Sequence, residues 1–349
     1  MTTESARNAA GTAETPAKSR EVRLAAHPDG ALTPAHFELA TVEVARPADG
    51  EVLVRNDYLQ ITAVMQDLMK PEPDLPMPAY QVGARLWGGA VGTVVESNSP
   101  DLAPGDLVES MDGFGQYSTA PADQFHKLDR DAFPSPVHYL TQGPTAYHGM
   151  VDIAEVGEGD TVFVSGAAGG VGSLAGQIAK ARGAKRVIGA AGSKAKVDYL
   201  VNELGYDAAF DYHDGPVLDR LRELAPDGID VFFDTVGGEQ FEAAVQASAQ
   251  GARFALCGAL SGQVGDSQGA FPRLDVMTAI VRQIVIRPFA TYHTPEQIQA
   301  WNSHFAQWLG EGKFVLPHTL VEGGIDAAPQ ALIDLLAGKY RGNVVVKLS

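Results

Sequence analysis

The hydrophobic pattern changes near residue 140 and divides the chain into two parts. In residues 20–130, short runs rich in β-branched residues are separated by glycine and proline turns, which is typical of β-strands. After residue 139, short apolar runs alternate with segments whose apolar residues recur every three or four positions. This alternation predicts a parallel sheet with helices on both faces. We therefore expect an α/β protein in which a β-rich domain precedes a doubly wound domain.

The predicted elements set the expected domain boundaries. The second part carries predicted helices that include residues 139–153, 239–249 and 295–310, and predicted strands at residues 161–166, 186–190, 208–211, 229–236, 252–258 and 284–290. A last strand, at residues 343–348, is expected to return to the β-rich domain, because the second sheet is already complete. The expected division is a disordered tail at residues 1–19, a β-rich domain at 20–140 that is completed by 311–349, and a doubly wound domain at 141–310.

The glycine-rich turn after the strand at residue 161 is the strongest functional signal. Apolar residues at helical spacing follow it, up to Arg182. In such a strand–turn–helix unit, glycine lets the backbone approach a pyrophosphate, and the N–H groups at the start of the helix bind it. We therefore predict a dinucleotide site whose pyrophosphate turn consists of Gly169, Gly170, Val171, Gly172 and Ser173. The alternative is a structural turn that binds no ligand.

The end of the second predicted strand indicates which nicotinamide cofactor is used. NAD sites usually place an acidic residue there to bind the ribose hydroxyls. This strand runs into residues 190–196 (AAGSKAK), which contain no acid and two lysines, Lys194 and Lys196. A lysine attracts a 2′-phosphate, which a carboxylate would repel, so the sequence predicts NADP(H). The alternative is that these lysines are solvated residues at the start of a helix.

The composition argues against several other functions. The 349-residue chain has a formal charge of −17 at pH 7 and a single cysteine, Cys257. We expect no nucleic-acid partner for so acidic a chain, and one cysteine allows neither an intramolecular disulfide nor a zinc site built from several cysteines. The histidines show no metal-binding spacing, so no metal is expected. No apolar run is long enough to cross a bilayer, so we expect no membrane association, and the low cysteine content fits a cytoplasmic protein.

Several motifs, taken together, resemble one family. They are residues 143–149 (GPTAYHG), the run VFVSGAAGGVGSLAGQIAK from Val162, the run GAAGSKAKVDYL from Gly189, and DGIDVFFDTVGG from Asp227. On these residues the chain resembles the zinc-free medium-chain dehydrogenase/reductases, and within them the prostaglandin reductase and leukotriene dehydrogenase-like branch, which includes 2-alkenal and double-bond reductases. The resemblance implies a GroES-like catalytic domain joined to a Rossmann domain, with NADPH in the cleft between them.

The resemblance also implies a reaction and further cofactor contacts. The implied reaction is the NADPH-dependent reduction of the carbon–carbon double bond of an α,β-unsaturated aldehyde or ketone, by hydride transfer to the β carbon and without a metal. Lys196 matches a residue that holds the 2′-phosphate, and Tyr212 matches a tyrosine beside it. Thr235 stands where the family has asparagine. Two further segments match the nicotinamide half of the site, and they contribute Cys257, Gly258, Phe289 and Thr291.

The substrate side departs from the family pattern. The family carries an Asp-Pro-Tyr-Met-Arg run where this chain has residues 62–66 (TAVMQ), and a tyrosine after the Cys-Gly motif is replaced by Gln263. The enolate oxygen formed in the implied reaction needs a hydrogen-bond donor. The candidates in this chain are Gln66, Tyr80 and Gln263, and the alternative for each is a structural or loop role.

Three functions remain open from the sequence. The first is a 2-alkenal or enone reductase, and the second is an NADPH-dependent quinone oxidoreductase, because the glycine turn is shared with that group. The third is a cofactor-binding protein without turnover, because the substrate side is altered. We expect a homodimer in which the sixth strand pairs across a two-fold axis through residues 284–286. His148 and His293 are expected near the cleft, in loop or core roles.

Overall fold

The structure, a computed structural model, describes residues 15–73, 75, 77–263, 271–290 and 292–349. Residues 1–14 of the predicted tail and the predicted site residue Thr291 lie outside the described residues. The predicted tail extends too far, because β1 (Lys18–Leu24) begins within it. Lys18 and Ser19 already pair with β2 (Phe37–Glu43) in a two-stranded antiparallel sheet.

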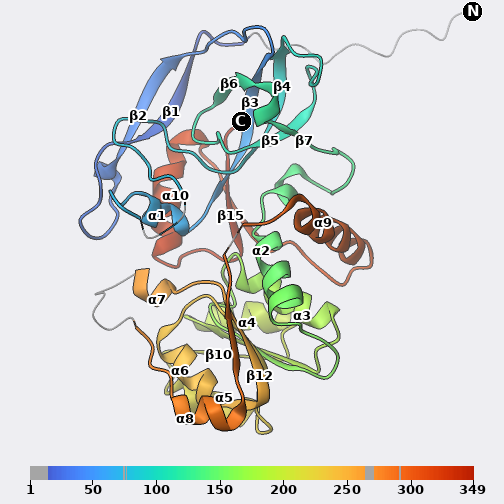
Figure 1. The fold of residues 1–349 in the computed structure, drawn as a ribbon. Coiled ribbons are helices and arrows are strands. Elements are labelled where there is room, and N and C mark those ends of the chain that lie inside the picture. Colours follow the sequence, from blue (N-terminus) through green and yellow to red (C-terminus); the bar gives the residue numbers. More distant parts are fainter. Residues whose placement is uncertain (1–14, 74, 76, 264–270, 291) are drawn as a thin grey trace, which may run out of the picture.

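A seven-stranded sheet forms the β-rich part of the molecule. Its strands follow the order β14-β15-β3-β4-β5-β7, and β6 pairs with β3. Their bounds are β3 Glu51–Ile61, β4 Ala90–Ser97, β5 Leu107–Ser110, β6 Tyr117–Pro121, β7 His126–Lys127, β14 His318–Val321 and β15 Asn343–Lys347. The C-terminal strand β15 pairs with β3, so the end of the chain returns to this sheet as expected (Figure 1). Two helices that the hydrophobic pattern did not reveal, α1 (Val64–Leu68) and α10 (Ala328–Leu336), contribute apolar residues to its core.

A second sheet of six parallel strands has the order β10-β9-β8-β11-β12-β13. Its strands are β8 Thr161–Val164, β9 Arg186–Ala191, β10 Ala208–Asp211, β11 Ile229–Asp234, β12 Ser248–Leu256 and β13 Val285–Pro288. The strand order reverses between β8 and β11, which is the position where doubly wound sheets bind dinucleotides. The expected Rossmann fold is therefore confirmed, and the glycine turn lies at this switch point.

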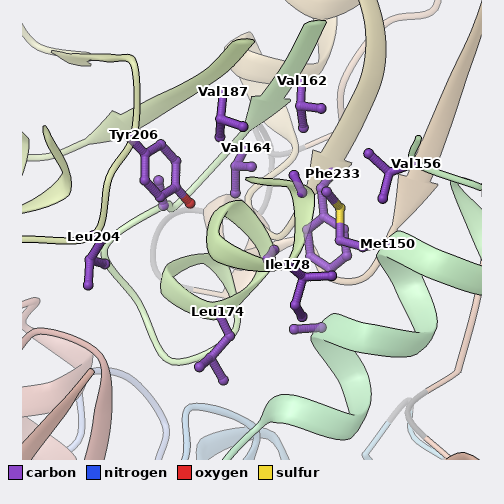
Figure 2. Close-up of a cluster of buried hydrophobic side chains, with 14 of the residues drawn as sticks. Met150, Val156, Val162, Val164, Leu174, Ile178, Val187, Leu204, Tyr206 and Phe233 are labelled. Carbon is purple, nitrogen blue, oxygen red and sulfur yellow. The ribbon is translucent and has the colours of Figure 1, made fainter. Parts of the chain in front are cut away.

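Helices cover both faces of the six-stranded sheet. They are α3 (Gly172–Ala181), α4 (Lys194–Asn202), α5 (Val217–Leu224), α6 (Gly238–Gln246) and α8 (Val276–Arg282). Alternate residues of β8 show why both faces are covered: Val162 and Val164 belong to one buried cluster, and Phe163 belongs to another. Figure 2 shows the first cluster, in which Ile178 of α3 lies close to Phe233 of the sheet.

The predicted helix at residues 139–153 is broken into three pieces. These are a 3₁₀ turn at Pro136–Tyr139, α2 (Gly143–Tyr147) and a π-helical segment, η4 (His148–Ile153). One reason for the break is that the N–H of Gln142 donates to the side chain of Asn343 on β15, at 2.9 Å, instead of to a helical carbonyl. By contrast, α9 (Pro295–Gly310) matches its prediction residue for residue, with a capping box at Thr294 and Gln297. No helix in the described part of the chain is long and apolar enough to span a membrane.

Candidate functional site

The glycine turn joins β8 to α3 at the carboxyl edge of the six-stranded sheet. Gly172 is the first residue of α3, and a Cβ atom there would lie 2.5 Å from the carbonyl oxygen of Gly166. Gly166 has a φ of +54°, a left-handed conformation that side-chain-bearing residues rarely adopt. Only glycine permits so close a contact within the turn. The glycines of the turn therefore present main-chain atoms, and no side chains, to a ligand.

The start of α3 offers two backbone N–H groups that have no acceptor in the described part of the protein. The N–H groups of Gly169 and Ser173 donate to carbonyls within the turn, and Gly170 adjoins the parallel bridge between Gly169 and Gly342, whereas no described hydrogen bond uses the N–H groups of Val171 or Gly172. Unpaired N–H groups at a helix N-terminus, together with the helix dipole, bind phosphate. Ser173 is fully buried, and its hydroxyl donates to the carbonyl of Gly170 at 3.5 Å, so its predicted cofactor contact stays a prediction. The remaining turn fits a pyrophosphate.

A buried aspartate organises the edge of the sheet beside this turn. Asp234, at the end of β11, is 2 % exposed. Its Oδ1 accepts hydrogen bonds from the hydroxyl of Ser165 at 2.7 Å and from the N–H groups of Val236 and Gly237, both at 2.9 Å. Burial raises the pKa of Asp234, and the three hydrogen bonds oppose that rise. The network ties the glycine turn to the end of β11, and the sequence analysis did not identify it.

Three of the predicted nicotinamide-side residues follow the ends of β11 and β12. The hydroxyl of Thr235 donates to the carbonyl of Ser165 at 3.1 Å, so it stands directly beside the glycine turn. The N–H groups of Cys257 and Gly258 donate to the carbonyl of Asp234 at 2.8 and 3.1 Å. Burial raises the pKa of the Cys257 thiol to about 12. The thiol is therefore neutral at physiological pH, as expected of an inert core cysteine.

Phe289 follows β13 at the same edge, but its ring points into the core. The ring lies 6.2 Å from that of Phe233 and 5.6 Å from that of His148, measured between centroids. A Cβ atom at Gly149 would lie 2.5 Å from the Phe289 ring, so glycine is required where the two segments meet. Phe289 is thus half-buried, with its ring packed against the core.

The residues predicted to hold the 2′-phosphate lie together after β9. Lys196 is in the first turn of α4, and its Nζ donates to the carbonyl of Gly338 at 2.7 Å. Burial lowers the pKa of Lys196. The hydroxyl of Tyr212 would lie 2.8 Å from a Cβ atom at Gly192, so this ring covers the turn before α4. Lys194 instead pairs with Asp198 at 2.8 Å and is 85 % exposed, which agrees with the solvated alternative for that lysine.

An asparagine that the sequence analysis missed joins the two sheets at the glycine turn. Asn343 begins β15 and is 3 % exposed. Its Nδ2 donates to the carbonyls of Gly170 and Pro317, at 3.4 and 3.2 Å. The N–H of Gly342 donates to the carbonyl of Ala168 at 2.8 Å. The sequence feature that could have revealed Asn343 is a polar residue directly before the three valines of the C-terminal strand.

The three predicted donor candidates have different surroundings. Tyr80 is 2 % exposed and its hydroxyl donates to the carbonyl of Trp87 at 2.7 Å, so it is a core residue of the β-rich part and not a substrate donor. Gln66, in α1, has a buried Oε1 without a partner among the described residues. Gln263 ends α7 (Leu260–Gln263), and its side chain lies outside the described part of the structure.

A fourth glutamine, Gln60, was not predicted. It lies near the end of β3 between Leu59 and Ile61, which both enter the core of the β-rich part. Successive strand residues face opposite sides, so Gln60 faces away from that core. Its Nε2 is buried and, within the described ranges, has no hydrogen-bond partner. A buried amide donor without a partner is rare in proteins and marks a position where a ligand is expected.

The described residues contain no group of three or more histidine, cysteine, aspartate or glutamate side chains that could hold a metal ion. The polar groups at the site are instead backbone N–H groups, glutamine amides, hydroxyls and one lysine. This donor set suits a phosphate-bearing organic cofactor and a substrate with a carbonyl oxygen.

Comparison with known proteins identifies the family. Residues 20–128 match a model described as the N-terminal domain of oxidoreductases, and residues 170–307 match one described as zinc-binding dehydrogenase. The chain is 34 % identical to the NADPH-dependent curcumin reductase of Escherichia coli over 339 residues, which are 95 % of this chain and 97 % of that protein. It is 33 % identical to the NADP⁺-dependent 2-alkenal reductase of Nicotiana tabacum over 320 residues, which are 88 % and 91 % of the two chains.

A solved structure shows the same arrangement. The crystal structure of CurA from Vibrio vulnificus in complex with NADPH superposes with a TM-score of 0.87 at 32 % identity, covering 95 % of this chain and 99 % of that one. The switch-point turn, the returning C-terminal strand and this similarity over nearly the whole chain lead to one conclusion. The chain belongs to the zinc-free medium-chain dehydrogenase/reductases, an oxidoreductase family, and within it to the branch of double-bond reductases.

Proposed function

We propose that the protein is an NADPH-dependent reductase of the carbon–carbon double bond in α,β-unsaturated aldehydes or ketones. The observation that carries the proposal is that the glycine turn with its free N–H groups is accompanied by Lys196 in the first turn of α4, after a strand, β9, that contains no acidic residue. The related curcumin and 2-alkenal reductases support it, because both names refer to substrates with a double bond conjugated to a carbonyl.

The residues of the chain fit NADPH along the whole carboxyl edge of the sheet. Val171 and Gly172 would hold the pyrophosphate through their N–H groups, and Gly170 would let it approach the main chain closely. Lys196 has three N–H donors, so it can keep its bond to Gly338 and still donate to a 2′-phosphate. Thr235 would lie beside the nicotinamide half. When bound, the cofactor supplies the hydride, and the protein contributes positioning and polarisation of the substrate.

On the substrate side, the buried amides of Gln60 and Gln66 are the groups with unused hydrogen-bonding capacity. Negative charge develops on the carbonyl oxygen when an enone is reduced at its β carbon. A pre-positioned N–H donor, such as Nε2 of Gln60, would stabilise that charge, and one such donor contributes roughly 2.7–4 kcal/mol in other enzymes. The unpartnered atom of Gln66 is Oε1, an acceptor, so of the two side chains Gln60 is the better candidate for the donor to the carbonyl oxygen.

The protein is also proposed to act as a homodimer. The edge strand β13 pairs only with β12 among the described strands. Next to it, α8 exposes a row of apolar side chains: Val276 is 57 % exposed, Met277 66 %, Ile280 62 % and Val281 64 %. An exposed apolar face beside an open sheet edge favours association with a second copy. The cytoplasmic location remains a prediction from the single cysteine.

A substrate panel tests the proposed function against its alternatives. NADPH consumption would be followed with trans-2-alkenals, linear and cyclic enones and 1,4-naphthoquinone, with NADH in parallel. The proposal expects turnover of at least one enone or enal with NADPH. A large preference for the quinone would favour the quinone oxidoreductase, and NADPH binding without consumption on any substrate would favour a cofactor-binding protein.

A further inference from the structure

Thr145 and His293 form a polar pair that the proposed cofactor and carbonyl contacts do not use. The Oγ1 of Thr145 lies 2.9 Å from the Nε2 of His293, and Thr145 is 8 % exposed. The other ring nitrogen of His293, Nδ1, is buried and has no hydrogen-bond partner in the described part of the structure. Leaving a buried polar nitrogen unpaired is costly, so this atom is expected to meet a ligand or a water molecule when the protein works.

The pair lies at the carboxyl edge of the six-stranded sheet. Thr145 is in α2, which begins next to the glycine turn, since a Cβ atom at Gly170 would lie 2.5 Å from the Oε1 of Gln142. One turn beyond Thr145, Gly149 already touches Phe289 at the end of β13. Thr145 therefore lies between the pyrophosphate turn and the segment that carries Phe289 and His293. In the proposed binding mode this position lies beside the nicotinamide, where the substrate would react.

A second histidine connects the pair with solvent. The ring of His148 lies 5.8 Å from that of His293, at 72°. The Nδ1 of His148 lies 2.8 Å from the carboxylate of Asp152, whose side chain is 45 % exposed. Gln297 of α9 also contacts the His148 ring, at 3.0 Å. Burial and the neighbouring His148 both lower the pKa of His293, so its imidazole is neutral at physiological pH and carries one proton.

We propose that Thr145 and His293 form a proton relay that completes the reduction by protonating the α carbon of the substrate. This inference rests on the proposed function. The enolate that remains after the double bond has received a hydride must gain one proton at its α carbon to become the saturated aldehyde or ketone. Thr145 gives its hydroxyl proton to that carbon, and the Nε2–H of His293 replaces it. As Nε2 gives up its proton, the Nδ1 of His293 takes one from water on the His148 side, so the ring stays neutral. Exchange of the ring proton with water after product release restores the Nε2–H form, so that each turnover consumes NADPH and one solvent proton.

The relay is tested by the stereochemistry of protonation as well as by rate. The substrate is an enone with a methyl group on its α carbon, so that protonation creates a stereocentre. Chiral chromatography then measures the ratio of the two product enantiomers. The wild type should give one enantiomer. Thr145→Val and His293→Leu should lower kcat by about 100-fold, the effect expected when a general acid is lost, and the remaining product should approach a racemate. Thr145→Ser keeps the hydroxyl and should keep both rate and enantiomeric purity.

Two controls separate the relay from a structural role. NADPH affinity, measured by fluorescence titration, should be unchanged in all the variants. His304→Gln removes another partly buried histidine, which contacts Tyr147 at 3.1 Å, and should leave rate and stereochemistry unchanged. If His293→Leu does not fold, the comparison of Thr145→Val with Thr145→Ser decides alone.

The outcomes distinguish this inference from the proposed function. Folded Thr145→Val that keeps the wild-type kcat and enantiomeric purity would overturn the relay while leaving the reductase in place. A wild type that reduces no enone at all would overturn the proposed function and the relay with it.

Discussion

The Nζ of Lys196 donates to the carbonyl of Gly338 at 2.7 Å. This bond connects α4, beside the proposed 2′-phosphate position, with the segment that follows α10 and leads into β15. The lysine is thus held in place, partly desolvated, before any phosphate arrives. A pre-positioned cation loses little conformational entropy on binding, so its contribution should appear in affinity for NADPH and not for NADH.

Lys196→Ala should therefore weaken NADPH binding by roughly 10- to 100-fold, the equivalent of one charge-assisted hydrogen bond, and NADH binding far less. Fluorescence titration with both cofactors measures the effect. Lys194→Ala is the matched control, because Lys194 pairs with Asp198 at the surface and should change neither affinity. Equal losses for the two cofactors in Lys196→Ala would mean that the lysine only supports the fold through Gly338.

Gly172→Ala should abolish cofactor binding or reduce it severely. The new Cβ atom would lie 2.5 Å from the carbonyl oxygen of Gly166, so the turn must open and the free N–H groups of Val171 and Gly172 must shift. Gly310→Ala, at the last residue of α9, is the control, since a Cβ atom there meets nothing within 4 Å. Both variants would be titrated with NADPH. Full affinity in Gly172→Ala would contradict the proposed pyrophosphate turn.

The buried Asp234 should make the free energy of unfolding depend on pH in a particular direction. Its pKa is raised in the folded protein by burial. The folded protein therefore keeps the carboxyl group of Asp234 protonated to a higher pH than the unfolded chain does. As a result, the contribution of Asp234 to the free energy of unfolding falls as the pH rises from near 4 towards the raised pKa. Asp234→Asn cannot titrate and should remove this part of the pH dependence.

Urea unfolding at a series of pH values compares the wild type with two variants of this residue. Asp234→Asn keeps an oxygen acceptor, so its loss of stability should be small. Asp234→Ala leaves the donors of Ser165, Val236 and Gly237 without their acceptor, and should lower the free energy of unfolding by roughly 2–4 kcal/mol. An unchanged pH profile in Asp234→Asn would show that the carboxyl group titrates alike in the folded and unfolded states.

The apolar face of α8 predicts how the protein associates. Ile280→Glu places a charge in the middle of that face, and should convert a dimer into a monomer in light scattering coupled to size-exclusion chromatography. Val82→Glu, at a residue that is 51 % exposed in the β-rich part, should leave the dimer intact. A wild type that is monomeric at micromolar concentration would contradict the proposed interface.

Much of the fold was predictable, because the doubly wound half follows local rules. The strand at residues 208–211 and the helix at 295–310 were placed exactly, since strong periodicity and a capping box mark them. The helix predicted at 139–153 was wrong in detail, because the N–H of Gln142 donates to the side chain of Asn343, 201 residues away in sequence. Local patterns carry no information about such a contact.

The cofactor side of the site was more predictable than the substrate side. The backbone of a glycine turn follows from spacing, and the preference for NADP(H) follows from the two lysines and the absence of an acid after β9, whereas the choice of Lys196 came from the family resemblance. For Tyr80 the structural alternative holds, because Tyr80 is buried in a core that residues of β15 and α10, more than 240 positions away, help to form. Gln60 and Asn343 were missed because a single polar residue in a strand says little by itself. The structure was needed to show that Nε2 of Gln60 has no partner among the described residues and that Nδ2 of Asn343 donates to Gly170.

The most direct test of the central claim is to identify the product formed from a trans-2-alkenal and NADPH by gas chromatography with mass spectrometry against authentic standards, because the saturated aldehyde and the allylic alcohol have the same mass but different retention times. The account predicts the saturated aldehyde, formed with NADPH in strong preference to NADH, in step with NADPH consumption. An allylic alcohol as the product would show that the carbonyl group, and not the double bond, is reduced. That result, or no NADPH consumption with any enal or enone, would contradict the account.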